Sequence, residues 1–396
     1  MKVQRLLFMM AMSAALFSCG NGNTNNNGDW VTRSTFRGPQ RAQAVAFTVE
    51  DTGYVGLGFG SNNTYFNDFY GYSPAQGLWT AIAPFPGYAR ASASAFATVK
   101  YGYVGLGVNE NALQTYPLGI GSGAGSGVGG ITNNAYMEDF WRFDPSQNVW
   151  DSMPPVPITP FTGGHPGRYE AVGFSVPDQG IGAFLGGTDD AYQAYGDYYV
   201  WTEAGNSGSW SQAVSYPGQP VRGAVAFTHD DHVYLLTGMN NQNQYVYDCW
   251  YWDPKLGPTS AASWPQLIFP NGPRPRAIGN VTDQSYDAGY HIARVNAVAF
   301  SMNNNGIPKG YVMFGSNGAN LSDCWEYDFP TDSWTPKTPY PPAGGARSFA
   351  IALTINDSGY VGLGTTGGSV SGTTFYQDFT QFYPALPYNQ DDYGGN

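Results

Sequence analysis

The sequence predicts an all-β protein, and three observations lead to this expectation. Short segments rich in Tyr, Phe, Trp and Val are separated by Gly, Asn, Asp and Pro, and no segment has the apolar spacing of an amphipathic helix. The segment that begins at Asp139 carries Phe140, Trp141 and Phe143 on both of its faces, as a strand covered on both sides does. In addition, one motif recurs along almost the whole chain, so similar sheets are expected side by side.

The recurring motif is an Asp followed by a run of aromatic residues. It is most complete from Tyr136 to Trp150, where the sequence reads YMEDFWRFDPSQNVW. The six aspartates are Asp68, Asp139, Asp197, Asp248, Asp323 and Asp378. An Arg, a run of small residues, a polar turn and an apolar segment precede each copy, and the six arginines are Arg41, Arg90, Arg168, Arg222, Arg294 and Arg347. Four short strands in a repeat of about fifty residues are typical of one blade of a β-propeller, so six blades are predicted.

The repeat also resembles a known family. GYVGLG at 102–107 followed by DFWRFDPSQNVW at 139–150 is similar to kelch repeats, especially those of cell-envelope lipoproteins of the Bacteroidetes type, and the resemblance covers roughly residues 29 to 390. The double glycine usual in kelch repeats survives only at Gly186 and Gly187. The resemblance implies a single six-bladed propeller of the galactose oxidase and kelch superfamily.

The start of the chain is expected to close the ring of blades. Trp79, Trp150, Trp210, Trp264 and Trp334 each introduce the fourth strand of one of the first five blades, but no Trp follows Phe382 in the last copy. The segment from Trp30 to Phe36 has no place in the first blade, so we expect it to supply the outer strand of the sixth. This closure removes an exposed sheet edge.

Residues 1–18 are expected to be a lipoprotein signal peptide. Lys2 and Arg5 precede an apolar core that is too short to span a membrane, and the segment ends at Cys19, which resembles the lipidated residue of a lipoprotein. An ordinary secretory signal with an incidental Cys is the alternative. Residues 19–28 then form a lipidated flexible tether and residues 29–396 the propeller, held at the cell envelope, in the outer membrane, on its periplasmic or cell-surface side.

The composition excludes some partners. The net charge is −12, and after Lys2 and Arg5 are removed with the signal, 15 basic residues stand against 29 acidic ones, a net charge of −14. Such a surface argues against binding to nucleic acid or to anionic lipid. Cys249 and Cys324 occupy the same repeat position in neighbouring blades, which lie about 10 Å apart, too far for a disulfide, so both thiols are expected to be unpaired.

The repeated arginines and aspartates allow two interpretations. They are expected at the same end of each blade. In the first interpretation, the six arginines form a cationic ring at the channel mouth that binds an anion. In the second, each Arg forms a structural ion pair with an Asp in its own or a neighbouring blade. The recurrence in every blade favours the structural interpretation, because a binding site seldom needs sixfold repetition.

A few residues could carry catalytic or binding chemistry. Glu170 is the single acidic residue within a first strand and, with Arg168, could supply acid-base chemistry and carboxylate recognition, as the resemblance in overall plan to kelch enzymes acting on sialic acid implies. The connections on the same face carry His165 and His291, which are further candidates for binding. Kelch copper oxidases use converging His and Tyr ligands, which are not apparent in this sequence, so we expect no metal and no cofactor.

The connections at one end of the propeller are the candidate functional surface. Three insertions, Asn109–Asn134, Pro154–Gly167 and Asn271–Tyr290, are expected at that end, where they either build a binding surface or merely cover the channel mouth. Aromatic residues of the loops there could stack on sugars, anchor a protein or pack between blades: Tyr65, Phe66, Tyr116, Tyr192, Tyr195, Tyr245 and Phe375. We therefore expect a non-catalytic binding or scaffold module for a protein or glycan partner, as a monomeric domain or part of an envelope complex. The alternative is a carbohydrate-active enzyme such as a sialic acid mutarotase or epimerase.

Overall fold

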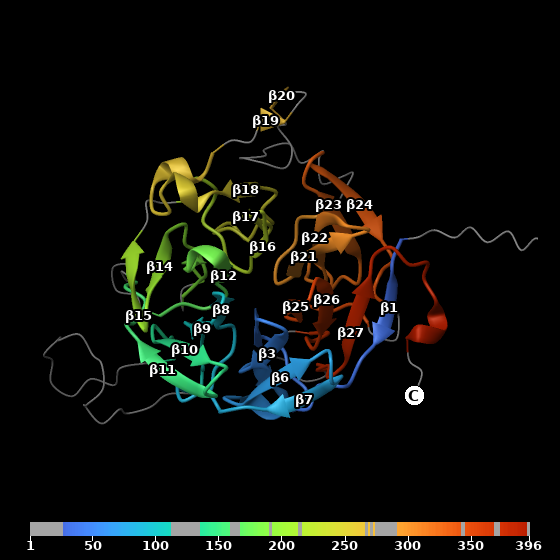
Figure 1. Ribbon diagram of the computed structural model, residues 1–396, viewed down its shortest axis with the longest axis horizontal. Coiled ribbons are helices and arrows are strands. Elements are labelled where there is room, and N and C mark those ends of the chain that lie inside the picture. The colour runs from blue at the N-terminus through green and yellow to red at the C-terminus, as the bar shows by residue number, and fades with distance from the viewer. Residues whose placement is uncertain are drawn as a thin grey trace, which may run out of the picture.

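A computed structural model describes the chain over residues 27–111, 135–158, 167–189, 192–212, 216–265, 268–269, 272–273, 291–341, 345–367 and 373–393. Six antiparallel sheets stand around a central axis like the blades of a propeller (Figure 1). This confirms the predicted all-β, six-bladed fold. The predicted signal peptide, Cys19 and most of the tether lie outside the described residues, as do most of the three insertions.

Each blade begins at the axis and ends at the outer surface. Blade one consists of β2 (Val45–Val49), β3 (Thr52–Gly56), β6 (Phe69–Ser73) and β7 (Leu78–Ala81), and the hairpin of β4 (Phe59–Gly60) and β5 (Thr64–Tyr65) extends it. Blade two consists of β8 (Ser94–Ala97), β9 (Gly102–Gly105), β10 (Phe140–Asp144) and β11 (Val149–Met153). Blade three consists of β12 (Val172–Val176), β13 (Ile181–Leu185), β14 (Tyr198–Ala204) and β15 (Ser207–Gln212).

The second half of the ring repeats this plan. Blade four contains β16 (Val225–His229), β17 (His232–Leu236) and β18 (Cys249–Trp252), and the short hairpin of β19 (Ile268–Phe269) and β20 (Gly272–Pro273) follows it. Blade five contains β21 (Val298–Asn304), β22 (Ile307–Met313), β23 (Cys324–Asp328) and β24 (Ser333–Lys337). Blade six contains β25 (Ile351–Ile355), β26 (Ser358–Gly362), β27 (Phe379–Tyr383) and, from the other end of the chain, β1 (Asp29–Thr32).

The N-terminal strand closes the ring, as predicted. β1 pairs antiparallel with β27, with Trp30 opposite Phe382, and the two strands lie side by side in Figure 1. The Trp30 side chain is fully buried and its ring stacks on Phe382 at a centroid distance of 4.3 Å. Its Nε1–H donates a 3.0 Å hydrogen bond to the carbonyl of Thr338 in blade five. One residue therefore joins the first strand to two blades near the end of the chain.

Blade four departs from the prediction of a fourth strand at Trp264. In its described residues the outer strand is replaced by two short 3₁₀ helices, η3 (Pro254–Leu256) and η4 (Ala261–Ser263), and Trp264 follows the second. Pro254 starts the first helix because it has no N–H to donate to a sheet ladder. Trp264 nevertheless keeps its place in the core, since it is buried and its Nε1–H donates to the Tyr198 hydroxyl at 3.2 Å.

Glycines of the second strands let neighbouring blades approach closely. A Cβ placed on Gly102 would lie 2.0 Å from the Phe47 ring of blade one, and one on Gly182 would lie 2.1 Å from Phe96 of blade two. The first glycine of the GYVGLG segment thus provides the space for an aromatic side chain of the preceding blade. Cys249 and Cys324 are both buried and unpaired, which confirms the prediction for these two thiols.

Candidate functional site

Six residues, one from each blade, join their backbones into a closed ring just before the innermost strands. The N–H of each donates to the carbonyl of its counterpart in the preceding blade at 2.9–3.1 Å, and the first blade's N–H donates to the sixth blade's carbonyl. All six have φ between 48° and 60°. This backbone ring consists of Gln43, Ser92, Glu170, Gly223, Asn296 and Phe349. Because left-handed backbone is unfavourable for most residues, the hydrogen bonds from blade to blade hold a conformation that isolated strands would avoid.

Five of the six repeated arginines are buried in ion pairs within their own blades. In blade five, Nη1 of Arg294 lies 2.6 Å from Oδ1 of Asp323 and also donates to the carbonyl of Phe314 at 3.0 Å. The same bonds recur at Arg41, Arg90, Arg168 and Arg347, and none of the five side chains is more than 4% exposed. The pairing expected on the structural interpretation is therefore present in these five blades.

Aromatic rings cover several of these buried arginines. The guanidinium carbon of Arg41 lies 4.2 Å from the centroid of Phe66, and that of Arg168 lies 3.7 Å from the centroid of Tyr195. Such stacking stabilises a buried guanidinium group. Two of the loop aromatics proposed from the sequence are thus half-buried and stack on arginines of the repeat.

Blade four breaks the pattern, and the alignment of Arg222 with the other five arginines is wrong by one residue. In blade three, the carbonyl of Arg168 accepts a hydrogen bond from the N–H of Gly107. In blade four, the carbonyl of Val221 accepts the equivalent hydrogen bond from the N–H of Gly187. Val221 therefore holds the position that the buried Arg has in the other blades. Arg222 comes one residue later. Since successive side chains of an extended segment point to opposite sides, Arg222 points away from the ion-pair position that the other five occupy.

Arg222 instead meets Glu170 of the backbone ring. Its Nη1 donates to Oε2 of Glu170 at 2.9 Å, and its Nη2 lies 3.1 Å from Sδ of Met239. Burial raises the pKa of Glu170, while Arg222 and a hydrogen bond from the Asn296 side chain partly oppose that rise. We call Glu170, Arg222 and Asn296 the axial cluster. It unites blades three, four and five.

Gly223 makes this cluster possible. It occupies the backbone ring between Glu170 and Asn296, and a Cβ at this position would lie 2.3 Å from Oδ1 of Asn296. With a glycine here, the Asn296 side chain has the space to reach Glu170. Neither Asn296 nor Gly223 was predicted from the sequence. A repeated pattern in the sequence could have indicated them. Polar side chains recur two residues before the inner strands, and blade four has a glycine at that position.

Three tyrosines interact at Tyr169, the residue next to Glu170 of the axial cluster. The rings of Tyr136 and Tyr169 lie 5.8 Å apart between their centroids, and the Tyr192 side chain is 68% exposed. Burial raises the pKa of the Tyr169 hydroxyl far above its usual range, and the nearby Glu170, Tyr136 and Tyr192 add to this rise. Tyr136 and Tyr192 thus both interact with Tyr169, the chain neighbour of Glu170, and Tyr192 presents its ring to solvent; we call Tyr136, Tyr169 and Tyr192 the tyrosine group.

The other candidates from the sequence are not part of this cluster. Arg168 is buried against Asp197, so the two residues suggested for acid-base chemistry, Glu170 and Arg168, belong to different networks. His291 is exposed, and its backbone carbonyl accepts a 2.7 Å hydrogen bond from Arg294. His165 lies outside the described residues, as does Tyr116.

Neither a metal site nor a membrane-spanning helix is found in the described part of the chain. There, no three His, Cys, Asp or Glu side chains come together as metal ligands. Over the same residues, no helix has the length and apolar character needed to cross a membrane.

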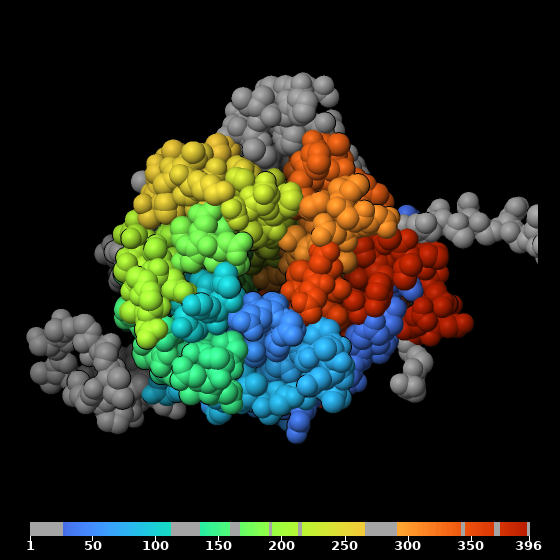
Figure 2. All heavy atoms as spheres, viewed as in Figure 1, coloured from blue at the N-terminus to red at the C-terminus, as the bar shows by residue number. Residues whose placement is uncertain are grey.

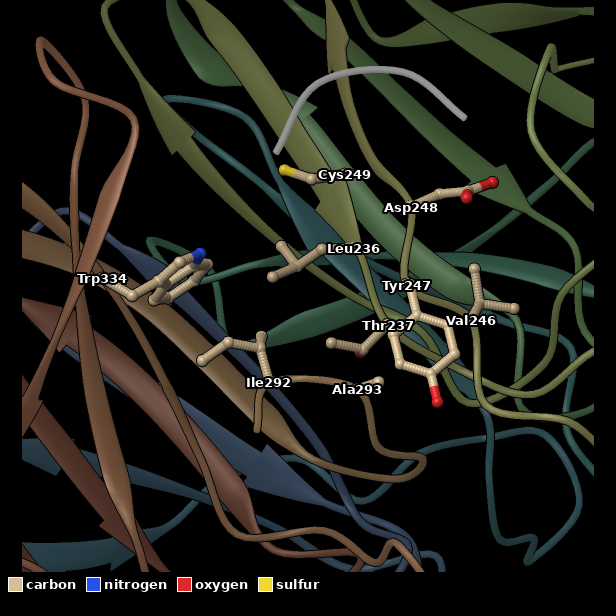
Figure 3. Close-up of a pocket in the computed structure, with 9 residues that line it drawn as sticks. All are labelled: Leu236, Thr237, Val246, Tyr247, Asp248, Cys249, Ile292, Ala293 and Trp334. Atoms are coloured by element: carbon tan, nitrogen blue, oxygen red, sulfur yellow. The ribbon is translucent and has the colours of Figure 1, made fainter. Parts of the chain in front are cut away.

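A small cavity between blades four and five is too small to be a ligand site. Figure 3 shows Cys249, Leu236, Trp334 and Ile292 around a common space of about 20 Å³. Cys249 occupies the position of Phe69 in blade one and Phe140 in blade two, as the strand registers show. The void thus lies where a larger aromatic side chain would fill the core, and it has room for roughly one water molecule.

Comparisons with known proteins agree with the fold and leave the function open. A model of the kelch motif matches residues 128–157. The solved structure of YjhT is similar with a TM-score of 0.59 and 14% sequence identity, over 88% of this chain and 96% of that one. No curated protein sequence matches significantly. The chain is therefore a six-bladed β-propeller that carries a kelch motif. Since 649 chains of known structure match it, the fold alone does not select a function.

Proposed function

We propose that this protein is a non-catalytic binding module of the cell envelope that recognises a glycan at the tyrosine group and the axial cluster. The observation that carries the proposal is the exposed ring of Tyr192, 68% accessible, which interacts with Tyr169, the residue next to Glu170 in the chain. Aromatic rings stack on the apolar faces of sugars, and a few converging polar groups fix the orientation of such a ligand. The tyrosine group and the axial cluster together offer both kinds of contact.

The charges of the site favour a neutral sugar. Arg222 is matched by Glu170 at 2.9 Å, so the pair carries no net charge. The other five repeated arginines are bonded to aspartates inside their blades. With a net charge of −12 on the whole chain, an acidic ligand would be repelled at long range. Hydroxyl-rich neutral glycans are therefore the ligands that best fit this surface.

The location at the envelope is part of the same proposal. The basic start, the short apolar segment and Cys19 support lipid anchoring in the outer membrane, with the propeller as a monomeric domain or a component of an envelope complex. Replacement of Cys19 with Ser should release the protein from the membrane fraction. A Cys19→Ser protein that still fractionates with the membrane and still carries lipid would contradict the anchor.

The glycan proposal is tested by thermal shift of the purified protein against a panel of neutral oligosaccharides. A ligand at a hundred times its Kd adds about 2.7 kcal/mol to the free energy of unfolding, which gives a clear rise in Tm. Tyr192→Ala should abolish the rise. Tyr388→Ala is the matched control, because Tyr388 is 40% exposed on the C-terminal tail. A panel without any rise, or a rise that Tyr192→Ala leaves unchanged, would favour a protein partner instead.

A second candidate, a carbohydrate-active enzyme such as a sialic acid mutarotase, rests on the axial cluster. Burial raises the pKa of Glu170 above that of an ordinary carboxyl, as is typical of a catalytic acid or base, and Arg222 lies beside it. The test is NMR exchange between the anomers of a sialic acid with and without the protein. Acceleration that Glu170→Gln removes would support an enzyme. Exchange at the uncatalysed rate would leave the binding module as the better account.

A further inference from the structure

A second site lies on the axis at the opposite end of the inner strands. A cavity of about 250 Å³ opens between the turns that connect the first and second strands, and Figure 2 shows it as a hollow at the centre of this face. None of the axial cluster residues lines it. Alanines of the inner strands, such as Ala46, Ala226 and Ala299, line it together with phenylalanines of the same strands. The cavity is therefore separate from the proposed glycan site.

A ring of hydroxyl groups surrounds this cavity. Five of the six inner strands contribute one at equivalent positions, namely Thr48, Ser175, Thr228, Ser301 and Thr354. Three of these hydroxyls donate to the backbone carbonyl of the equivalent residue in the preceding blade, at 2.6–2.9 Å. The bonds run from Thr228 to Ser175, from Ser301 to Thr228 and from Thr354 to Ser301. Because these three protons are already used, the oxygens can offer a ligand only lone pairs. These three hydroxyl oxygens thus form an acceptor surface.

The rim outside the hydroxyl ring is acidic. The turns that follow the lining strands carry Glu50, Asp51, Asp178, Asp230, Asp231 and Asp357. The same turns contribute one lysine, Lys100, while Lys255 reaches Asp231 at 2.9 Å from outside them. Carboxylates around the mouth of a cavity with low-dielectric walls concentrate a negative potential there. The rim therefore attracts cations toward the acceptor oxygens.

We propose that this cavity binds a small aliphatic amine. A primary ammonium has three N–H donors and no acceptor, which is the complement of the three hydroxyl oxygens of Thr228, Ser301 and Thr354. The alanine methyl groups can surround a short alkyl chain, and the acidic rim supplies charge complementarity. A carboxylate or phosphate ligand would meet repulsion from the rim and would find no free donor on Thr228, Ser301 or Thr354.

The test is isothermal titration of the purified full chain with 1,5-diaminopentane, with 1,5-pentanediol as the uncharged probe of the same length. We expect saturable binding of one diamine per chain that weakens as salt is raised, and no binding of the diol. Ala226→Leu, which fills the cavity, should abolish binding. Equal heats for diamine and diol, or one-to-one binding that Ala226→Leu leaves intact in a folded protein, would overturn the proposal.

Exposed rim residues keep the test independent of folding. The double substitution of Glu50→Gln and Asp230→Asn changes two solvent-exposed turn residues and should weaken diamine binding by up to about fivefold for each carboxylate. Asp391→Asn is the matched control, because this carboxylate is exposed on the C-terminal tail, away from the turns of the rim. A loss of affinity per removed carboxylate as large in the control as in the rim variant would reduce the effect to net charge alone and would contradict a defined site.

Discussion

Nη1 of Arg222 in blade four donates a 2.9 Å hydrogen bond to Oε2 of Glu170 in blade three. The five other repeated arginines form ion pairs within a blade, so this pair is the exception among the described arginines of the repeat. It joins two neighbouring blades at the backbone ring. Together with Asn296, it converts a repeated structural device into a single asymmetric polar cluster beside the tyrosine group.

Replacement of Trp30 with Ala should destabilise the whole propeller. The side chain is fully buried and bonds to both blade six and blade five, so the loss is expected to be about 3–5 kcal/mol in the free energy of unfolding. Leu78→Ala is the control, because Leu78 is 59% exposed on an outer strand and its loss should cost no more than about 0.5 kcal/mol. Urea denaturation measures both. Similar midpoints for the two variants would contradict closure through β1.

Replacement of Gly223 with Ala should disrupt the axial cluster. Gly77 provides a matched control, since its φ of 63° is close to the 60° of Gly223 but a Cβ there would meet nothing within 4 Å. Both substitutions pay the cost of a left-handed alanine, about 1 kcal/mol. Gly223→Ala should cost about 2 kcal/mol more, because the new Cβ collides with Asn296. Equal losses of stability in thermal unfolding would show that the contact has no energetic weight.

The Arg90–Asp139 pair predicts a loss of stability in acid. Burial alone would raise the pKa of Asp139, but the charge and hydrogen bonds of Arg90 outweigh it and lower the pKa below its usual value. A carboxyl with a lowered pKa in the folded state contributes stability above its unfolded pKa of about 3.9 and loses it as the pH falls through the folded value. The difference in unfolding free energy between the natural protein and Asp139→Asn should therefore shrink below about pH 4. A difference that stays constant from pH 7 to pH 3 would contradict this.

Glu170 predicts a pH dependence of the opposite sign. Burial raises its pKa in the folded protein, so the protonated form favours folding and this contribution is lost as the pH rises through the folded pKa. Relative to Glu170→Gln, the natural protein should become less stable as the pH is raised from about 4 toward neutrality. Urea denaturation at several pH values measures the difference. A difference that grows with pH would mean that Arg222 outweighs the cost of burial.

Much of the fold was predictable because local patterns determine it. The Asp and aromatic motif marks the third strand of each blade, and the missing Trp after Phe382 was enough to predict closure by Trp30. The Arg and Asp repeat predicted ion pairs that are present in five blades. The absence of a disulfide between Cys249 and Cys324 followed from the distance between neighbouring sheets.

The sequence by itself determined the number of blades, their order and the closure of the ring, because each depends on a repeat that is read within about fifty residues. Only the tertiary structure decided the axial cluster. Val221 and Arg222 differ by one position, and a shift of one residue in extended backbone turns a side chain to the opposite side. Glu170 and Asn296 are far apart in the chain, and they come together because the backbone ring places Gly223 of blade four between them. No local pattern encodes which side chains meet at an axis shared by six blades.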